Sequence, residues 1–268
     1  MRNGRASYIG LIAASVAALF AGVADAQPRK PAVACVPGDT FVARVKTVFD
    51  GRTLALADGR EVLLASIETP GTWARDALPA LVAGRDLSFS QIAPQPDRYG
   101  RLLARAFRDE DGTPLALEAE MVGKGLAVAG MPPANDKSGR NCLETLLAAE
   151  NTARKAKLGL WSDPDYDTKA SDNPTAILAA RGRFTIIEGK VLSVGESGGT
   201  VYINFGRRWS EDFTVTILKR LSARFTAAGM DPKRLEGRKV RVRGFVEERG
   251  GPWIEATGPE QIEIAEGP

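Results

Sequence analysis

Residues 40–67 read TFVARVKTVFDGRTLALADGREVLLASI, and this stretch decides the fold. It contains three runs of β-branched and other apolar residues, separated by the pairs Asp50-Gly51 and Asp58-Gly59. An Asp-Gly pair between apolar runs is a strong signal for a hairpin turn. The stretch therefore predicts a meander of three strands over Thr40–Val48, Thr53–Ala57 and Glu61–Ile67.

The residues after this meander predict a helix, two more strands and two further helices. The first helix covers Thr72–Ala83, where Pro79 would limit or kink it. The remaining elements are strands at Asp86–Ile92 and Arg101–Phe107 and amphipathic helices at Pro114–Lys124 and Cys142–Lys157. This is the order of a five-stranded Greek-key barrel, an OB-fold, with appended helices. The predicted class is mainly β with α (α+β).

A second, smaller OB-like β-barrel is expected in the C-terminal part. Residues 163–182 begin with polar, turn-forming residues and predict a linker, which bounds the domains at 35–162 and 183–265. A helix over Leu218–Ala228, ending at Gly229, falls between the third and fourth strands, which is the OB-fold order. The predicted strands are Phe184–Val194, Thr200–Phe205, Phe213–Ile217, Lys239–Val246, and Trp253–Glu255 with Gln261–Ile264.

The N-terminus has the pattern of an export signal. Arg2 and Arg5 precede a charge-free apolar run over residues 9–23, and residues 24–26 read Ala-Asp-Ala, a signal-peptidase pattern. The run is shorter than the about 20 residues that a membrane-spanning helix needs. We expect residues 1–26 to be a signal peptide, with an N-terminal anchor as the alternative. The expected location is the periplasm or the extracellular space, without stable membrane insertion after cleavage.

The chain contains two cysteines, Cys35 and Cys142. In an oxidising compartment they would pair, and the bridge would close a loop of about 100 residues. Such a bridge is worth about 4–5 kcal/mol in the chain-entropy treatment. The alternative is two separate buried thiols.

Composition narrows the chemistry before any motif is considered. The chain has 268 residues, 36 Lys+Arg, 33 Asp+Glu and no His. Without His, nucleophilic triads that use it, a His general base and a His metal ligand are all excluded. Catalysis would have to use carboxylates, Arg, Lys, Tyr or a metal held by oxygen atoms. The near-neutral charge does not by itself indicate nucleic-acid binding.

Short motifs, in order along the chain, resemble those of the staphylococcal nuclease (thermonuclease-like) family. They are Val48-Phe49-Asp50-Gly51-Arg52-Thr53, Leu64-Ala65-Ser66-Ile67-Glu68-Thr69-Pro70, Asp97-Arg98-Tyr99-Gly100-Arg101, Gly125-Leu126-Ala127 and Gly159-Leu160-Trp161. The resemblance covers most of residues 40–162, and the family's barrel is an OB-fold. It implies a phosphodiesterase that uses Ca²⁺, two arginines and a glutamate.

The resemblance assigns roles residue by residue, and this sequence departs from the pattern at the first metal ligand. The family's metal-binding Asp after the Asp-Gly turn falls at Arg52, which would repel a cation. A second metal-binding Asp falls at Glu68, and Thr69 and Pro70 match. Any metal would therefore involve Glu68 and Thr69.

Two more positions of the family's catalytic set are also replaced. The family's glutamate, which activates water, falls at Gly71, and one phosphate-binding arginine falls at Leu63. The other arginine is retained as Arg101. Loss of one transition-state stabiliser typically costs about 2.7–4 kcal/mol, so the sequence favours a degenerate site, unless Glu61 or Asp76 substitutes.

The surviving residues also have purely structural interpretations. Arg101 would serve as a phosphate ligand or as an ion-pair partner of Glu68 or Asp97. Asp50 is at least as well explained as a turn residue, and Trp161 as a packing residue.

The second barrel has a basic strand. Lys239, Arg241 and Arg243 alternate with valines and share one face, and Arg207 and Arg208 follow a strand that carries Tyr202 and Phe205. Cations among aromatics on an OB barrel suit single-stranded nucleic acid. The alternative is an ordinary solvated face, neutralised by Glu247, Glu248, Glu255 and Glu263.

The sequence thus favours an exported thermonuclease-like protein that binds nucleic acid or another polyanion with a degenerate nuclease site. The expected phosphate-binding residues are Arg98, Tyr99, Arg101, Arg207, Arg208, Lys239, Arg241 and Arg243. No cofactor is expected; Ca²⁺ would be needed only for the alternative, an active nuclease with a rearranged site. A further alternative is an envelope scaffold or protein-interaction module, whose protein partner the sequence does not identify.

Overall fold

The computed structural model describes residues 1, 35–133, 136, 139–208 and 210–265. Residues 2–26 of the expected signal peptide lie outside the described residues. From Ala32 to Pro268 the chain forms one compact unit. In the described part of the chain, no helix has both the length and the apolar character needed to span a membrane.

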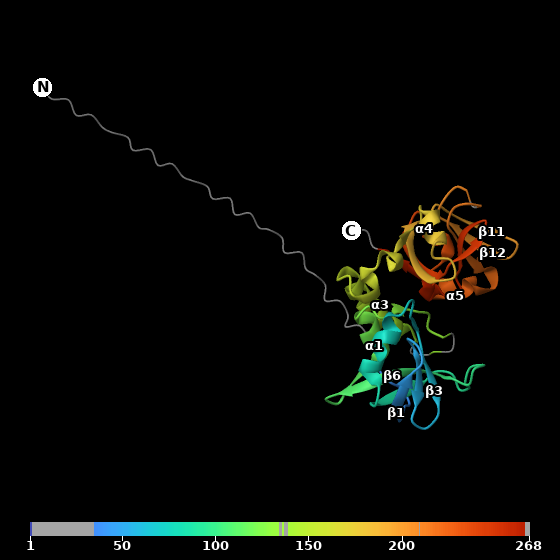
Figure 1. Cartoon of the computed structure of the whole chain (residues 1–268). Coiled ribbons are helices and arrows are strands. Elements are labelled where there is room, and N and C mark those ends of the chain that lie inside the picture. The colour runs from blue at the N-terminus through green and yellow to red at the C-terminus, as the bar shows by residue number, and fades with distance from the viewer. Residues whose placement is uncertain (2–34, 134–135, 137–138, 209, 266–268) are drawn as a thin grey trace. The chain divides into compact units, whose positions relative to one another are not determined.

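The first part forms a closed five-stranded barrel (Figure 1). Its strands are β1 (Phe41–Val48), β2 (Thr53–Leu56), β3 (Glu61–Leu64), β5 (Asp86–Gln91) and β6 (Leu102–Glu110). They follow the order β3-β2-β1-β5-β6, and a parallel pairing of β3 with β6 closes the ring. The strand order and the helix between the third and fourth barrel strands confirm the predicted OB-fold.

Short elements complete this part of the chain. They are β4 (Ile67–Glu68), α1 (Trp73–Val82), β7 (Thr113–Ala116), α2 (Leu117–Gly123), β8 (Val128–Ala129), α3 (Gly139–Lys155) and η1 (Gly159–Ser162). The prediction of one helix over residues 114–124 is wrong at its start. There β7 extends β6 as a hairpin, turning at Asp111 and Gly112, both of which have positive φ.

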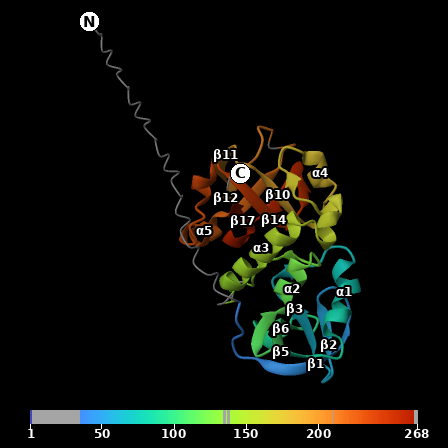
Figure 2. The ribbon, with the colours of Figure 1, turned by 90° about the vertical axis from the view of Figure 1, so that its left-hand side faces the viewer.

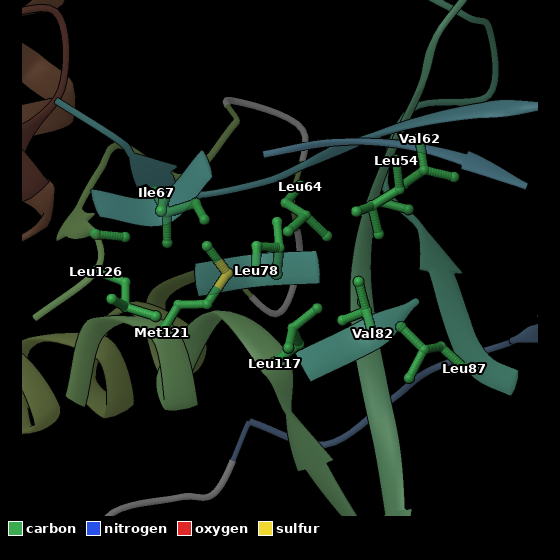
Figure 3. Packing of buried hydrophobic residues seen from close by; sticks show 14 of the residues in the cluster. Leu54, Val62, Leu64, Ile67, Leu78, Val82, Leu87, Leu117, Met121 and Leu126 are labelled. Carbon is green, nitrogen blue, oxygen red and sulfur yellow. The ribbon is translucent and has the colours of Figure 1, made fainter. Parts of the chain in front are cut away.

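The core of this barrel lies between the strands and two helices (Figure 3). Leu54 and Val62 come from the strands, Leu78 from α1, and Leu117 and Met121 from α2; all are almost fully buried. Full burial of one such side chain stabilises the fold by about 1.5–3 kcal/mol. The loops before α1 and after β5 are therefore attached to a rigid scaffold.

The second part, called the second barrel below, consists of two sheets whose elements follow the OB-fold order. Its main elements are β10 (Phe184–Lys190), β11 (Ser193–Ser197), β12 (Thr200–Asn204), β13 (Thr214–Leu218), η3 (Lys219–Leu221), α5 (Ser222–Ala227), η4 (Pro232–Leu235), β14 (Lys239–Phe245), β15 (Glu247–Arg249), β16 (Gly251–Glu255), η5 (Pro259–Gln261) and β17 (Ile262–Ile264). β13 and β16 pair in parallel, as β3 and β6 do in the first barrel. Figure 2 shows β10, β14 and β17 side by side, in agreement with the sheet order β17-β14-β10-β9.

Residues 163–182, predicted to be a linker, are folded. They contain η2 (Pro164–Tyr166), β9 (Lys169–Ala170) and α4 (Pro174–Leu178). Asn173 caps α4 by accepting from the backbone N–H of Ala176, and Ile177 is fully buried. β9 pairs in parallel with β10. Asp163 and Asn173, two of the polar residues that predicted a linker, are thus helix caps within a structured segment.

Cys35 and Cys142 form a disulfide, as predicted from the sequence. Cys35 precedes β1 and Cys142 lies in α3, and both pack with Phe107 of β6. The bond therefore ties the start of the described chain to the long helix that follows the barrel.

Candidate nuclease-like site and nucleic-acid interface

The turn after β1 brings Gly51 against Ala74 of α1. The Asp50 carboxylate accepts hydrogen bonds from the backbone N–H groups of Arg52 and Thr53, at 2.7 and 2.6 Å. A Cβ at Gly51 would lie 2.7 Å from the Ala74 Cβ, so the close approach requires glycine. Asp50 therefore acts as a turn residue, as one of the two sequence interpretations proposed.

Arg52 and Glu68 form an ion pair, with 3.0 Å between Arg52 Nη1 and Glu68 Oε1. The same Nη1 donates to the carbonyl oxygen of Ile67 at 2.5 Å. Burial raises the pKa of Glu68, and the charge of Arg52 opposes that rise. A guanidinium thus lies against the carboxylate that the resemblance places at a metal-binding position.

Gly71 faces a side chain from outside the barrel. It has φ +69°, and a Cβ built on it would lie 2.6 Å from the hydroxyl oxygen of Tyr166. Tyr166 belongs to η2, in the segment that follows the barrel. The Tyr166 side chain therefore fills the space where a side chain at position 71 would begin. The sequence did not predict this contact, because the two residues are far apart in the chain.

The loop after β5 presents a tyrosine and two arginines. Tyr99 is 64% exposed, and the guanidinium carbons of Arg98 and Arg101 lie 4.8 and 5.1 Å from the centre of its ring. Arg101 also donates to Asp97 from Nε at 2.9 Å and from Nη2 at 2.7 Å. The hydrogen bonds from Arg101 hold the pKa of Asp97 below its usual value. Arg101 is thus an ion-pair partner of Asp97, and its guanidinium remains partly exposed beside Tyr99.

The carboxylates considered as substitutes do not gather around Glu68. Asp76 pairs with Arg75 at 3.4 Å, and Glu61 lies opposite Ala55 in the β2–β3 pairing. Leu63 lies on β3 between Thr53 and Leu103 of the neighbouring strands. Among the described residues, no three His, Cys, Asp or Glu side chains are close enough together to hold a metal ion.

A buried acid that the sequence did not single out lies beneath β6. Glu118 of α2 is fully buried, and its Oε1 accepts from the backbone N–H of Ala106 at 3.1 Å. Its Oε2 has no hydrogen-bond partner in the described part of the chain. Burial raises the pKa of Glu118 to about 7. A glutamate in an amphipathic helix gave no sequence signal, because such residues usually face solvent.

The basic face of β14 is largely neutralised by acids. Lys239 Nζ lies 2.7 Å from Glu188 Oε1, and Arg241 Nη2 lies 2.6 Å from Glu188 Oε2. Burial raises the pKa of Glu188, but hydrogen bonds from Lys239 and Arg241 outweigh burial and leave it below its usual value. Glu263, which the sequence named as a possible neutraliser, lies 3.9 Å from Arg241.

The third cation of β14 corrects the expectation of a shared solvent face. Arg243 is 0% exposed; it pairs with Glu150 of α3 at 3.0 Å and donates to the carbonyl oxygen of Ala129 at 2.7 Å. Burial lowers its pKa, but the carboxylates of Glu150 and Glu263 outweigh burial and raise it. Alternation placed Arg243 on the correct side of the strand, but it could not show that α3 covers that position. A ligand cannot reach this guanidinium in the folded protein.

Arg207 and Arg208 are exposed beyond the end of β12. Arg208 Nη1 pairs with Glu211 at 2.9 Å, and its backbone N–H donates to Asp212 at 2.7 Å. Phe205 packs on Phe213 with ring centres 4.9 Å apart, so it belongs to the core side. Phe205 also lines a hollow together with Lys239 and Glu188, so the structure brings one predicted aromatic residue close to a β14 cation that is paired with an acid.

Comparison with known proteins gives one family. The model for staphylococcal nuclease homologues matches residues 61–163. A protein named "uncharacterized endonuclease" from Escherichia coli O157:H7 is 31% identical over 131 residues, which cover 46% of this chain and 78% of that relative. A protein of the same name from Escherichia coli gives the same identity and coverage.

Proposed function

Because the chain belongs to the staphylococcal nuclease homologue family, we propose that it is an exported protein whose nuclease-like barrel binds nucleic acid or a similar polyanion without metal-dependent cleavage. The observation that carries the proposal is the Arg52–Glu68 ion pair, 3.0 Å long, at the family's metal position. A fixed positive charge there excludes a divalent cation through repulsion and also occupies the carboxylate.

Calcium, which the family implies, does not fit the residues present. Calcium takes six to eight oxygen ligands. Here Arg52 donates to two of the nearby oxygen atoms, on Ile67 and Glu68, and Gly71 brings no carboxylate. Nothing in the described residues therefore supports a hydrolytic step that runs through a metal ion.

The proposed contact with the polyanion is the loop of Arg98, Tyr99 and Arg101. The exposed ring can stack on a base, and the two guanidinium groups near it can contact phosphates. Arg207 and Arg208 are further candidate contacts, whereas Lys239 and Arg241 would first have to release Glu188. The loop and the surrounding barrel are the parts of the fold that we expect to determine binding.

Export is part of the proposal and is supported by the disulfide, since such bonds persist in oxidising compartments. N-terminal sequencing of the protein recovered from the periplasm or the medium tests it. We expect the mature chain to begin at Gln27. An intact N-terminus in the cytoplasmic fraction would contradict export.

A labelled single-stranded DNA 20-mer, incubated with the protein in Ca²⁺ or in chelator, tests both binding and cleavage. We expect binding that weakens about tenfold between about 50 and 200 mM salt, for two or three phosphate contacts. Arg101→Ala should reduce it, whereas Arg44→Ala, which removes another arginine paired with an aspartate, should not. Binding that does not change with salt would count against phosphate contacts.

The second candidate function is an active endonuclease, which the name of the relatives at 31% identity favours. The same assay separates the two. Calcium-dependent cleavage that Arg101→Ala abolishes would establish the endonuclease and overturn the binding proposal. A calcium titration followed by calorimetry gives an independent answer, because we expect no binding at millimolar Ca²⁺.

A further inference from the structure

The outer face of the second barrel carries a hollow of about 610 Å³. Its floor is the sheet of β12 and β13, and its ends are formed by β11 and β16. Residues on these strands alternate, so Val201 and Ile203 enter the core while Tyr202 and Asn204 face outward. In an OB-fold, this face and the loops beside it bind oligonucleotides or oligosaccharides.

Aromatic rings provide the apolar part of the hollow. Tyr202 is 37% exposed in the middle of the floor, and no atom lies within 4 Å of a Cβ built at the neighbouring Gly195. Trp253 of β16 lies beneath the Arg249 guanidinium, whose carbon is 3.0 Å from the ring centre. The open space beside Tyr202 lets the flat face of a ligand ring stack there.

Uncharged polar groups line the rest of the floor. Tyr202 lies opposite Thr216 and Asn204 opposite Thr214, and Thr214 Oγ1 donates to Asn204 Oδ1 at 3.3 Å. Hydroxyl and amide groups both donate and accept hydrogen bonds. A row of such groups beside an aromatic ring suits a ligand that carries many hydroxyl groups.

The cations in and beside the hollow are each paired with an acid. Arg249, which lines it, lies 3.4 Å from Glu247, and Lys219 and Lys233 both pair with Glu196 of the lining, at 3.0 and 3.4 Å. Glu255 lies in the same cross-strand row as Thr216 and Tyr202, and within the described ranges no cation forms an ion pair with it. A phosphate chain in the hollow would meet this carboxylate, whereas a sugar hydroxyl could donate to it.

We propose that this hollow binds a neutral oligosaccharide chain, with a sugar ring stacked on Tyr202 and a hydroxyl donating to Glu255. This site is separate from the arginines of the first barrel and does not depend on the function proposed for them. It gives the second barrel a ligand of its own.

Calorimetric titration of the full protein tests the proposal with three probes: chitohexaose, maltohexaose and isomaltohexaose. We expect one of them to bind, and Tyr202→Ala to weaken that binding about tenfold through loss of stacking. Phe245→Ala, which removes an exposed aromatic residue on β14, should leave it unchanged. Glu255→Ala should also weaken sugar binding, and it serves as the test variant if Tyr202→Ala does not fold.

Two other outcomes would overturn the proposal. Failure of all three sugars to bind at millimolar concentration would do so. A single-stranded DNA whose binding is lost in Tyr202→Ala or strengthened in Glu255→Gln would assign the hollow to nucleic acid. Loss of DNA binding in Arg101→Ala with sugar binding retained would show that the two sites are independent.

Discussion

Arg243 and Glu150 are 93 residues apart in sequence, yet Nη2 of the arginine lies 3.0 Å from Oε1 of the glutamate. The side chains are 0% and 1% exposed. A basic strand of the second barrel therefore provides a buried contact to the helix that follows the first barrel.

Arg243→Met should lower the free energy of unfolding by about 3–5 kcal/mol, because it leaves the Glu150 carboxylate buried without its charge partner. Urea denaturation measures this. The matched control is Arg44→Met, which breaks the exposed pair with Asp86 and should cost about 1 kcal/mol or less. If the two variants lowered the free energy of unfolding equally, the buried pair would be contradicted. The double variant Arg243→Met with Glu150→Met should recover part of the stability that Arg243→Met loses.

Gly71→Ala should destabilise the protein through two effects, backbone strain at φ +69° and collision with Tyr166. Strain alone costs about 1 kcal/mol, and the collision adds about 1–2 kcal/mol. Gly84→Ala isolates the strain, because Gly84 has φ +70° and nothing within 4 Å of the new Cβ. In a Tyr166→Ala background, Gly71→Ala should cost no more than the backbone strain. If the collision cost remains, Tyr166 does not fill the space next to position 71.

The contribution of Glu118 to stability should fall as pH rises. Its folded-state pKa of about 7 lies above the ordinary value of 4.5, so between these values the folded state holds a proton that the unfolded state releases. The contribution is complete below pH 4.5 and lost by about pH 7, and it amounts to about 3 kcal/mol.

Thermal melting of the protein and of Glu118→Gln at several pH values checks this. The difference in melting temperature, variant minus unmodified protein, should rise between pH 5 and pH 7.5. A difference that does not change with pH would show that Glu118 is not held neutral. The exposed Glu110→Gln serves as a control for loss of one carboxylate and should show no such trend.

Replacing both cysteines, Cys35→Ser with Cys142→Ser, should lower the free energy of unfolding by about 4–5 kcal/mol, since the bond closes a loop of 107 residues. Denaturant melts with and without reductant measure this. The unreduced protein should gain no mass on treatment with an alkylating agent under denaturing conditions. A gain of two alkyl groups would refute the bridge.

Much of the architecture could be predicted from local pattern. Asp50-Gly51 and Asp58-Gly59 set the meander because hairpin turns are determined by a few adjacent residues. The helix after the third strand of each part then identified the OB order. The helix predicted over residues 114–124 was wrong at its start, because Thr113–Ala116 extends β6 across a tight turn that apolar spacing does not reveal.

The candidate site was harder to predict, because its decisive contacts are long-range. The sequence placed Arg52 and Glu68 at equivalent family positions, but not the hydrogen bond from Arg52 to the Ile67 carbonyl. Alternation on β14 gave the face of Arg243 but not the α3 side chain that covers it. Tyr166 was assigned to a linker, so nothing in the pattern associated it with Gly71.

The contact between Gly71 and Tyr166 also constrains how this barrel can change over evolutionary time. Position 71 can accept a side chain only after Tyr166 has been replaced by a smaller residue. That first substitution brings no gain until the second one, at position 71, follows. The two positions are therefore epistatic. Introducing any side chain at position 71 therefore requires an ordered path through an intermediate that gains nothing, so the segment after the barrel restricts which residues this position can carry.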